Sequence, residues 1–298
     1  MSVLIYSKLT KIVIPVAGLG TRMLPASKAI PKEMLTVVDK PVIQHVVEEA
    51  IKAGFTEIIL VTRNGKASIE DHFDKHYELE TELARKGKDA LLRSVRDILP
   101  EGVTICAVRQ NQPRGLGHAV LCAAAVVGND DFAVMLPDML IHSTHTGQSD
   151  LADMVAGYHS SGAAQIMVEA VPFEHVERYG VVDCAGKPLS PGQSQAIVGM
   201  VEKPPQAEAP SNQAIVGRYI LPARVMALLK ETQPGAGGEI QLTDALDQLI
   251  HEAPVHAYSM RGKTYDCGHK LGFLQANVAF GLDHAETGAD FKNFLKSL

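Results

Sequence analysis

The sequence predicts an α/β fold in which a mixed, mostly parallel central sheet is flanked by helices on both faces. Apolar runs rich in β-branched residues alternate with helical segments in the first half of the chain, a pattern typical of parallel strands joined by helices. These strand runs are almost continuously apolar, as expected for strands that are buried on both faces. The chain of 298 residues is long enough for one large core. We therefore expect a single domain, residues 1–298, whose pattern changes near residue 162.

In the first half, glycines mark the ends of the clearest elements. Gly18 ends the first apolar run, and Gly54 stands where a C-terminal helix cap is expected. The strands are expected at 11–17, 56–62, 103–108 and 132–136. The helices are expected at 41–53, in a charged stretch from about 67 to 99, and from about 116 to 127.

In the second half, strand-like runs follow one another with turns between them, and helices return only near the C-terminus. The strands are expected at 165–171, 180–184, 196–201 and 214–221. The helices are expected at 222–231, 239–251 and 270–281. This half is therefore predicted to be more irregular than the first.

Composition excludes several classes of protein. The net charge of −6 argues against nucleic-acid or acidic-membrane partners, which bind basic surfaces. It leaves room for a small anion held in a local basic pocket. The longest nearly apolar run, 119–128, is about half a membrane span. Four cysteines lie far apart without a CxxC pair and indicate reduced thiols, so we expect a cytoplasmic protein.

The loop after the first strand, GLGTRMLPASKAIPKEML, fits neither common nucleotide-binding motif. A dinucleotide fingerprint needs GxGxxG, and Met23 stands where the third glycine would be. A P-loop needs GxxxxGK[ST], which does not occur in the chain. Two interpretations remain: a loop that binds an anion, and a solvated turn whose charges face water.

The residue types of this loop favour the anion. Gly18 and Gly20 allow the backbone to approach a ligand and to turn successive N–H groups toward it. Arg22 offers a planar fork that suits two phosphate oxygens. Lys28 and Lys32 add two point charges. Three cations after two glycines would neutralise a triphosphate better than a single phosphate.

Two aspartates that are far apart in the sequence are candidate ligands for Mg²⁺. Asp138 follows an apolar strand at its carboxyl end, where open α/β sheets bind ligands. Asp266 precedes Cys267 and Gly268 and is expected on a tight turn. Mg²⁺ is typically held by one or two carboxylates and takes its other ligands from phosphate and water. Either residue alone is more often a turn or cap residue, but the pair beside a cationic loop favours the metal.

At this point a family resemblance is evident. The loop resembles the signature G-x-G-T-R-x-L-P-x-T-K-x-x-P-K-E-M-L-P of bacterial UTP–glucose-1-phosphate uridylyltransferases. Further blocks follow in the family order: VRQNQPRGLGHAVLCA (108–123), VMLPDMLI (134–141), YGVVDC (179–184), VEKP (201–204), APSNQAIVGRYIL (209–221), GGEIQLTDA (237–245) and YDCGHKLGF (265–273). The chain departs from the pattern at Ser27, which replaces threonine, at Thr36, which replaces proline, and at His269, where relatives vary. It is similar, more weakly, to thymidylyltransferases that share G-x-G-T-R.

The resemblance implies a Rossmann-like nucleotidyltransferase fold and a Mg²⁺-dependent reaction. UTP and glucose 1-phosphate would give UDP-glucose and pyrophosphate. Residues of about 1–162 would bind the nucleotide, and residues of about 163–298 would bind the sugar phosphate and supply the C-terminal helices. The partners implied are these small molecules and further copies of the chain in a dimer or tetramer, without nucleic acid or membrane.

The resemblance also implies roles for individual residues. On the nucleotide side, the backbone of Gly18, Leu19 and Gly20 lines the nucleotide, and Arg22 and Lys32 hold the triphosphate. Gln110 and Gly115 meet the uracil edge, and Glu33 lies near the base or sugar. On the other side, Gly180, Glu202 and Gly217 bound the sugar pocket, Lys203 takes the phosphate of glucose 1-phosphate, and Asp138 and Asp266 bind Mg²⁺.

Two other functions stay open on the sequence. A thymidylyltransferase for a similar sugar phosphate is the first, because a 5-methyl group changes pyrimidine discrimination by only about 1–3 kcal/mol. The second is a catalytically silent regulatory homologue, against which the intact Arg22, Lys32 and Lys203 argue. Without the resemblance, Glu202 and Lys203 would be interpreted as an exposed ion pair of little consequence.

Overall fold

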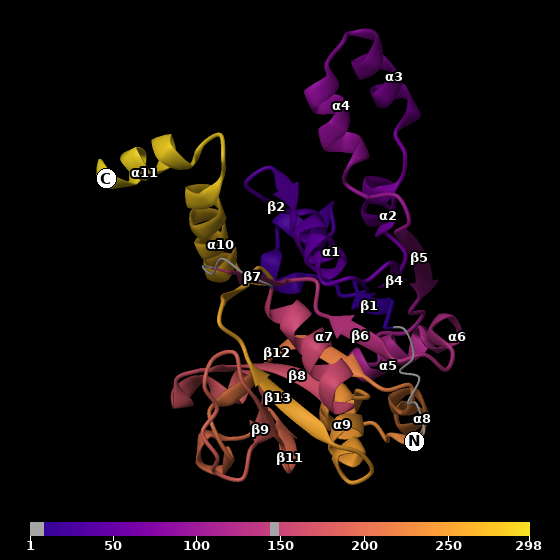
Figure 1. Cartoon of the computed structure of the whole chain (residues 1–298), viewed down its shortest axis with the longest axis vertical. Coiled ribbons are helices and arrows are strands. Elements are labelled where there is room, and N and C mark those ends of the chain that lie inside the picture. The colour runs from indigo at the N-terminus through magenta and orange to yellow at the C-terminus, as the bar shows by residue number, and fades with distance from the viewer. Residues whose placement is uncertain (1–8, 144–148) are drawn as a thin grey trace.

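The fold is built on one mixed sheet to which both halves of the chain contribute strands. The computed structural model describes residues 9–143 and 149–298. The strands that form the sheet are β1 (Lys11–Pro15), β4 (Glu57–Thr62), β5 (Thr104–Arg109), β6 (Phe132–Met135), β8 (Ala164–Ala170), β9 (Gly180–Asp183), β10 (Ser194–Ala196), β11 (Gly199–Glu202), β12 (Gln213–Leu221) and β13 (Val255–Ser259). Their order is β10-β13-β8-β12-β6-β1-β4-β5, with β9 and β11 attached beside β12 (Figure 1). The predicted α/β class is confirmed.

The direction of the strands separates the two halves of the sheet. β6, β1, β4 and β5 are parallel neighbours, so their carboxyl ends lie along one edge. β12 is antiparallel to both β6 and β8 and joins the second half to the first. The parallel part therefore presents four consecutive loops at one edge, which is where ligands bind in open α/β sheets.

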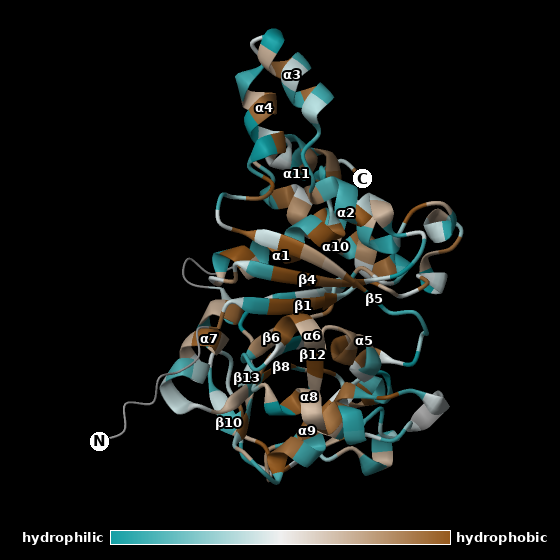
Figure 2. Ribbon diagram, turned by 90° about the vertical axis from the view of Figure 1, so that its right-hand side faces the viewer, coloured by the Kyte–Doolittle hydropathy of each residue, from teal (hydrophilic) through white to brown (hydrophobic). Residues whose placement is uncertain are grey.

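Helices cover both faces of the sheet, as the apolar strands predict. One face is covered by α1 (Val42–Lys52), α2 (Ala67–Phe73), α7 (Asp150–Ser161) and α10 (Lys270–Asp283), and the other by α5 (Leu116–Cys122), α8 (Arg224–Glu231) and α9 (Leu242–Ile250). Alternate residues of β1 enter the two cores: Ile12 and Ile14 pack with α1, and Val13 packs on the opposite face. Figure 2 shows the apolar central strands between these two helical layers.

Three predicted segments are each divided in the structure. The charged stretch 67–99 forms α2, α3 (Tyr77–Arg85) and α4 (Asp89–Arg96), and the last two stand away from the sheet (Figure 1). The ring nitrogen Nδ1 of His76 accepts from the backbone N–H of Leu79 and begins α3, and Gly87 with φ of 62° lies between α3 and α4. The segment 116–127 is divided into α5 and α6 (Ala124–Val127), and the segment 196–201 contributes to both β10 and β11.

Several elements were not predicted from the sequence. They are β2 (Thr36–Val37), β3 (Lys40–Pro41), β7 (Met139–His142), β13, β14 (Lys263–Asp266) and α7, whereas α11 (Gly288–Lys296) lies in the amphipathic segment 281–298, for which a helix is expected. The antiparallel pairing of β7 with β14 matters most for function, because it places Asp266 opposite Met139. Asp266 thus lies beside the chain segment that contains Asp138.

A buried arginine joins these parts. Arg218 in β12 is fully buried and donates from Nε and Nη2 to the carboxylate of Glu49 in α1, at 3.0 and 2.8 Å. It also donates to the carbonyl oxygens of Leu136 at 3.3 Å and Met139 at 2.6 Å. These carbonyls lie on either side of Asp138, so one guanidinium fixes the segment between β6 and β7.

Two further observations bear on the sequence predictions. All four cysteines are free thiols. In the described ranges 9–143 and 149–298, the helices all fall short of the length and apolar character that crossing a membrane requires.

We expect Glu49→Ala to lower the free energy of unfolding by about 3–5 kcal/mol, because it leaves the buried Arg218 charge without its partner. Glu252→Ala is the matched control, since its pair with Arg224 is exposed on both sides and should be worth about 0–1 kcal/mol. Urea denaturation of both variants measures the difference. Equal losses in the free energy of unfolding in the two variants would contradict the role assigned to the Glu49–Arg218 pair.

Candidate active site

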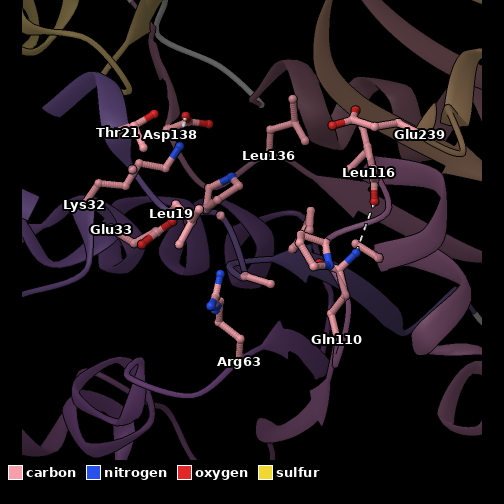
Figure 3. A pocket seen from close by; sticks show the side chains of 18 residues that line it. Leu19, Thr21, Lys32, Glu33, Arg63, Gln110, Leu116, Leu136, Asp138 and Glu239 are labelled. Carbon is pink, nitrogen blue, oxygen red and sulfur yellow. Dashed lines mark hydrogen bonds and ion pairs between the residues drawn. The ribbon is translucent and has the colours of Figure 1, made fainter. Parts of the chain in front are cut away.

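Two adjoining cavities open at the carboxyl edge of the parallel strands. The first, of about 390 Å³, lies between the loop 17–21 and the segment 110–119 (Figure 3). The second, of about 410 Å³, is lined by residues from both halves of the chain. Both are lined by Leu116, Leu136, Asp138 and Glu239. Asp138 therefore lies where ligands bound in the two cavities would meet.

The glycine loop is held in shape by its own residues. Gly20 has a φ of 69°, and a side chain there would come within 3.2 Å of the Lys32 Cβ atom. The Ser27 hydroxyl donates to the Gly20 carbonyl at 2.7 Å. Ser27 therefore keeps the hydroxyl of the threonine that it replaces. The loop lets Gly18, Leu19 and Gly20 line the first cavity with their backbone close to any ligand.

Four charges meet between the two cavities. The Lys32 ammonium lies 2.5 Å from Asp138 Oδ2, and both side chains are 14% exposed. Arg22 Nη1 lies 3.2 Å from Asp266 Oδ2, and its Nη2 lies 3.6 Å from Asp138 Oδ2. The two cations and two carboxylates thus neutralise each other. The predicted triphosphate and metal residues form one cluster.

The carboxylates converge closely enough to share a cation. A Cβ atom added to Gly268 would lie 2.4 Å from Asp138 Oδ2 and 2.8 Å from Asp266 Oδ1. Only a glycine fits there without displacing them. Among the residues that the structure describes, no group of three or more His, Cys, Asp or Glu side chains could hold a metal. A pair of hard oxygen donors suits Mg²⁺, which completes its shell with phosphate and water.

Cys267 belongs to the frame of this site. Its backbone N–H donates to the Asp138 carbonyl at 2.7 Å. Burial, together with the negative charges of Asp138 and Asp266, raises the pKa of the Cys267 thiol to about 12. Cys267 is therefore a neutral, unreactive thiol that packs against the carboxylate pair.

The opposite end of the first cavity is suited to a planar polar group. Gln110 donates from Nε2 to the Gly115 carbonyl at 3.2 Å, as the dashed line in Figure 3 marks, which leaves its Oε1 as an acceptor. Gly115 has a φ of 96°, and a side chain there would come within 2.7 Å of the Ile240 carbonyl. The segment after β5 can approach α9 this closely only with glycine.

The second cavity contains the predicted sugar-phosphate residues. Glu202 accepts from the Thr243 hydroxyl at 2.7 Å and pairs with Lys203 at 3.0 Å. Gly180 lies against the Glu202 carboxylate, 3.1 Å from where its Cβ would be. Lys203 has a φ of 48°, which is unfavourable for a residue with a side chain. Such strain at the end of β11 is typical of a functional position, and the Lys203 side chain remains 57% exposed.

Three predicted residues are less available to a ligand in these two cavities than the resemblance implies. Glu33 lines the first cavity but is buried and paired with Lys66 at 2.6 Å; burial raises the pKa of its carboxyl. Lys28 is exposed and lines a smaller adjoining pocket. Gly217 lines neither cavity: it lies behind Leu136, and its φ of 80° lets that side chain pack 2.6 Å from where a Cβ would be.

Sequence reasoning missed several residues that line the cavities. They are Thr21, Arg63, Glu239, Arg178, Tyr179 and Thr243. Arg63 follows β4 at its carboxyl end, the same signal that identified Asp138, and could have been found in that way. Glu239 lies in the block GGEIQLTDA, which was used only for the resemblance.

The fold and this site define a class of protein that comparison identifies. The profile described as nucleotidyl transferase matches residues 11–281, and the chain belongs to this family. UTP–glucose-1-phosphate uridylyltransferase of Escherichia coli strain K12 is 55% identical over 294 residues, 98% of this chain and 97% of that protein. The UTP-bound UGPase from Acinetobacter baumannii superposes with a TM-score of 0.92 at 55% identity, covering 98% of this chain and 100% of that chain.

A second solved structure agrees with the first. A UDP-glucose pyrophosphorylase complexed with UDP-glucose superposes with a TM-score of 0.83 at 42% identity, covering 93% of this chain and 100% of that one. The resemblance inferred from the sequence motifs is therefore confirmed. Within the nucleotidyl transferase family, these relatives are UTP–glucose-1-phosphate uridylyltransferases and UDP-glucose pyrophosphorylases.

We expect Gly115→Ala to weaken nucleotide binding, because the new methyl group must displace the Ile240 carbonyl and the start of α5. The backbone of Gly115, at φ 96° and ψ 175°, lies in a region that is essentially restricted to glycine, which adds about 1–3 kcal/mol of strain. Steady-state kinetics should show a raised KM for the nucleotide. Gly157→Ala, whose methyl group would make only ordinary contacts with Gln165, serves as the control. An unchanged KM in Gly115→Ala would contradict the close approach.

Proposed function

We propose that the protein is a UTP–glucose-1-phosphate uridylyltransferase, which forms UDP-glucose and pyrophosphate. The observation that supports this most is the pair of adjoining cavities, with Asp138 on the wall between them and cations on both sides. One cavity has cations at one end and Gln110 at the other, as a nucleotide requires, and the second has a lysine and a carboxylate for a sugar phosphate. The relatives named above act on, or are bound to, molecules of these types.

The nucleotide would lie across the ends of the parallel strands. Gln110 would accept from the ring N3–H of uracil through Oε1. The backbone of the glycine loop would run along the nucleotide, and Lys32 and Arg22 would bind phosphate oxygens. Both cations are already paired with carboxylates, so the incoming phosphates would take the place of those partners.

Asp138 and Asp266 are the residues that would hold Mg²⁺. When bound, this ion would neutralise charge on the reacting phosphates. Releasing Lys32 and Arg22 to the triphosphate would free both carboxylates for that role. The four charges would thus exchange partners without leaving any of them uncompensated in a half-buried site.

The second substrate would bind between Glu202 and Lys203. The Lys203 ammonium would hold the phosphate of glucose 1-phosphate, and Glu202, fixed by Thr243, would accept from sugar hydroxyls. An oxygen of that phosphate attacks the α-phosphorus of UTP, and the bond to the β-phosphate oxygen breaks in line, with the electron pair leaving on pyrophosphate. A phosphate monoester is largely ionised at neutral pH, so no strong base is needed.

The chief obstacle is repulsion between two anions. Arg22, Lys32 and Lys203 surround the point where they meet and would offset it, while the cavity walls position the reacting atoms. A homo-oligomer, as a dimer or tetramer, and a cytoplasmic location stay predictions of the family resemblance.

The proposal is tested by pyrophosphate release across a grid of substrates. We expect release from UTP with glucose 1-phosphate and Mg²⁺, and its loss when a chelator removes the metal. Faster turnover with dTTP than with UTP would instead favour a thymidylyltransferase. No release with any nucleotide in the grid would favour a catalytically silent homologue.

We expect Lys203→Ala to lower kcat/KM for glucose 1-phosphate about 10²–10³-fold, because a preorganised charge at the phosphate is lost. The KM for UTP should change little. Lys187→Ala, an exposed lysine that lines neither cavity, is the control. Normal use of glucose 1-phosphate by Lys203→Ala would refute the assignment.

A further inference from the structure

We propose that Arg63 is a specificity-determining residue that donates hydrogen bonds to a carbonyl oxygen of the uracil base. The inference rests on the proposed use of UTP and extends it. It assigns a function to a side chain that lines the first cavity and that the chemistry of phosphate transfer leaves unexplained.

The position of Arg63 follows from the order of the parallel strands. At their carboxyl ends, Asp138 follows β6, Gly18 follows β1, Arg63 follows β4 and Gln110 follows β5. Neighbouring strands lie about 4.8 Å apart, so the phosphate end at β6 and the base end at β5 are separated by three strand spacings. Arg63 is adjacent to Gln110 and two strands away from Asp138. It belongs to the base end.

Figure 3 shows the same arrangement from inside the cavity. Lys32 and Asp138 lie together at one end and Gln110 lies at the other, while Arg63 points from the rim into the space between Leu19 and Gln110. Arg63 also lines the adjoining pocket that contains Gln110 and a smaller pocket between the glycine loop and Lys66. Its guanidinium therefore faces open space where a ligand would lie.

Arg63 lacks an internal partner. In the described part of the chain, no residue accepts a hydrogen bond from its guanidinium or forms an ion pair with it. Glu33, the buried carboxylate that lines the same cavity, is bound to Lys66 instead. Arg22 and Lys32 are both paired. The donors of this partly exposed guanidinium are therefore available to acceptors on a ligand in the cavity.

The uracil edge supplies the matching groups. Its ring presents carbonyl acceptors on either side of one N–H donor, so Gln110 Oε1 can accept from the N–H while Arg63 donates to an adjacent oxygen. Cytosine keeps one of these oxygens, has an amino donor in place of the other, O4, and has no ring N–H. It would leave Gln110 Oε1 without a donor, and at O4, the oxygen that we assign to Arg63, it would place one donor against another. Thymine presents the same edge as uracil. The pair would thus select uracil and thymine against cytosine.

The test compares nucleotides in the Arg63→Met variant, with Arg109→Met as the matched control. Arg109 lines only the adjoining pocket and not the nucleotide cavity. We expect Arg63→Met to reduce the preference for UTP over CTP, as the ratio of kcat/KM values, about 10–100-fold. The ratio of UTP to dTTP and the KM for glucose 1-phosphate should not change, and Arg109→Met should keep all three values.

Other outcomes overturn the inference. An equal loss of kcat/KM with UTP and CTP would show that Arg63 binds phosphate. An unchanged UTP-to-CTP ratio would show that Arg63 does not recognise the base. If thermal unfolding shows that Arg63→Met does not fold, Arg63→Lys is tested in its place. This variant keeps the charge without the planar fork and should also lose discrimination. Should the wild-type protein release no pyrophosphate, the proposed function fails separately, and calorimetric binding of UTP and CTP to wild type and Arg63→Met still tests Arg63.

Discussion

The site depends on one buried charge. Arg218 is completely enclosed, and its guanidinium is held by the Glu49 carboxylate from helix α1 and by the carbonyls of Leu136 and Met139. An enclosed ion pair contributes little net stability, but losing one partner is costly, so such pairs act by enforcing geometry. Here the geometry is that of Asp138, which lies between the two carbonyls. The core thus positions the carboxylate through which the two cavities meet.

A second constraint is the balance of charge at the edge of the sheet. The protein carries a net charge of −6, yet its proposed substrates are both anions. Arg22 and Lys32 are concentrated in one loop and kept compact by pairing with Asp266 and Asp138. Cations held by carboxylates are preorganised for phosphate and do not repel each other. Lys203 at the sugar-phosphate end is likewise paired, with Glu202, whereas Arg63 at the base end has no such partner among the described residues.

The glycines of the site have a common physical purpose. At Gly115 and Gly268 an added Cβ would fall within 3 Å of a backbone oxygen or a carboxylate oxygen. Each allows two segments from distant parts of the sequence to come closer than side chains permit: the start of α5 against the residues just before α9, and the turn after β14 against the loop after β6. Gly217 does the same one layer deeper, beneath Leu136. These contacts explain why the site is compact, and none of them could be derived from local sequence.

What the sequence determined by itself is local. Apolar β-branched runs predicted β1, β4, β6, β8 and β12, which lie inside the sheet, because burial on both faces requires such runs. The same signal predicted β5, which the strand order leaves at the edge of the sheet without a buried residue. The glycine-and-cation loop predicted an anion site because its residue types favour an anion over a solvated turn. The tertiary structure decided the rest. The pairing of β7 with β14 brings Asp266 to Asp138 across more than a hundred residues. The strand order sets Arg63 beside Gln110. Long-range pairing depends on which surfaces meet, and no short pattern encodes that.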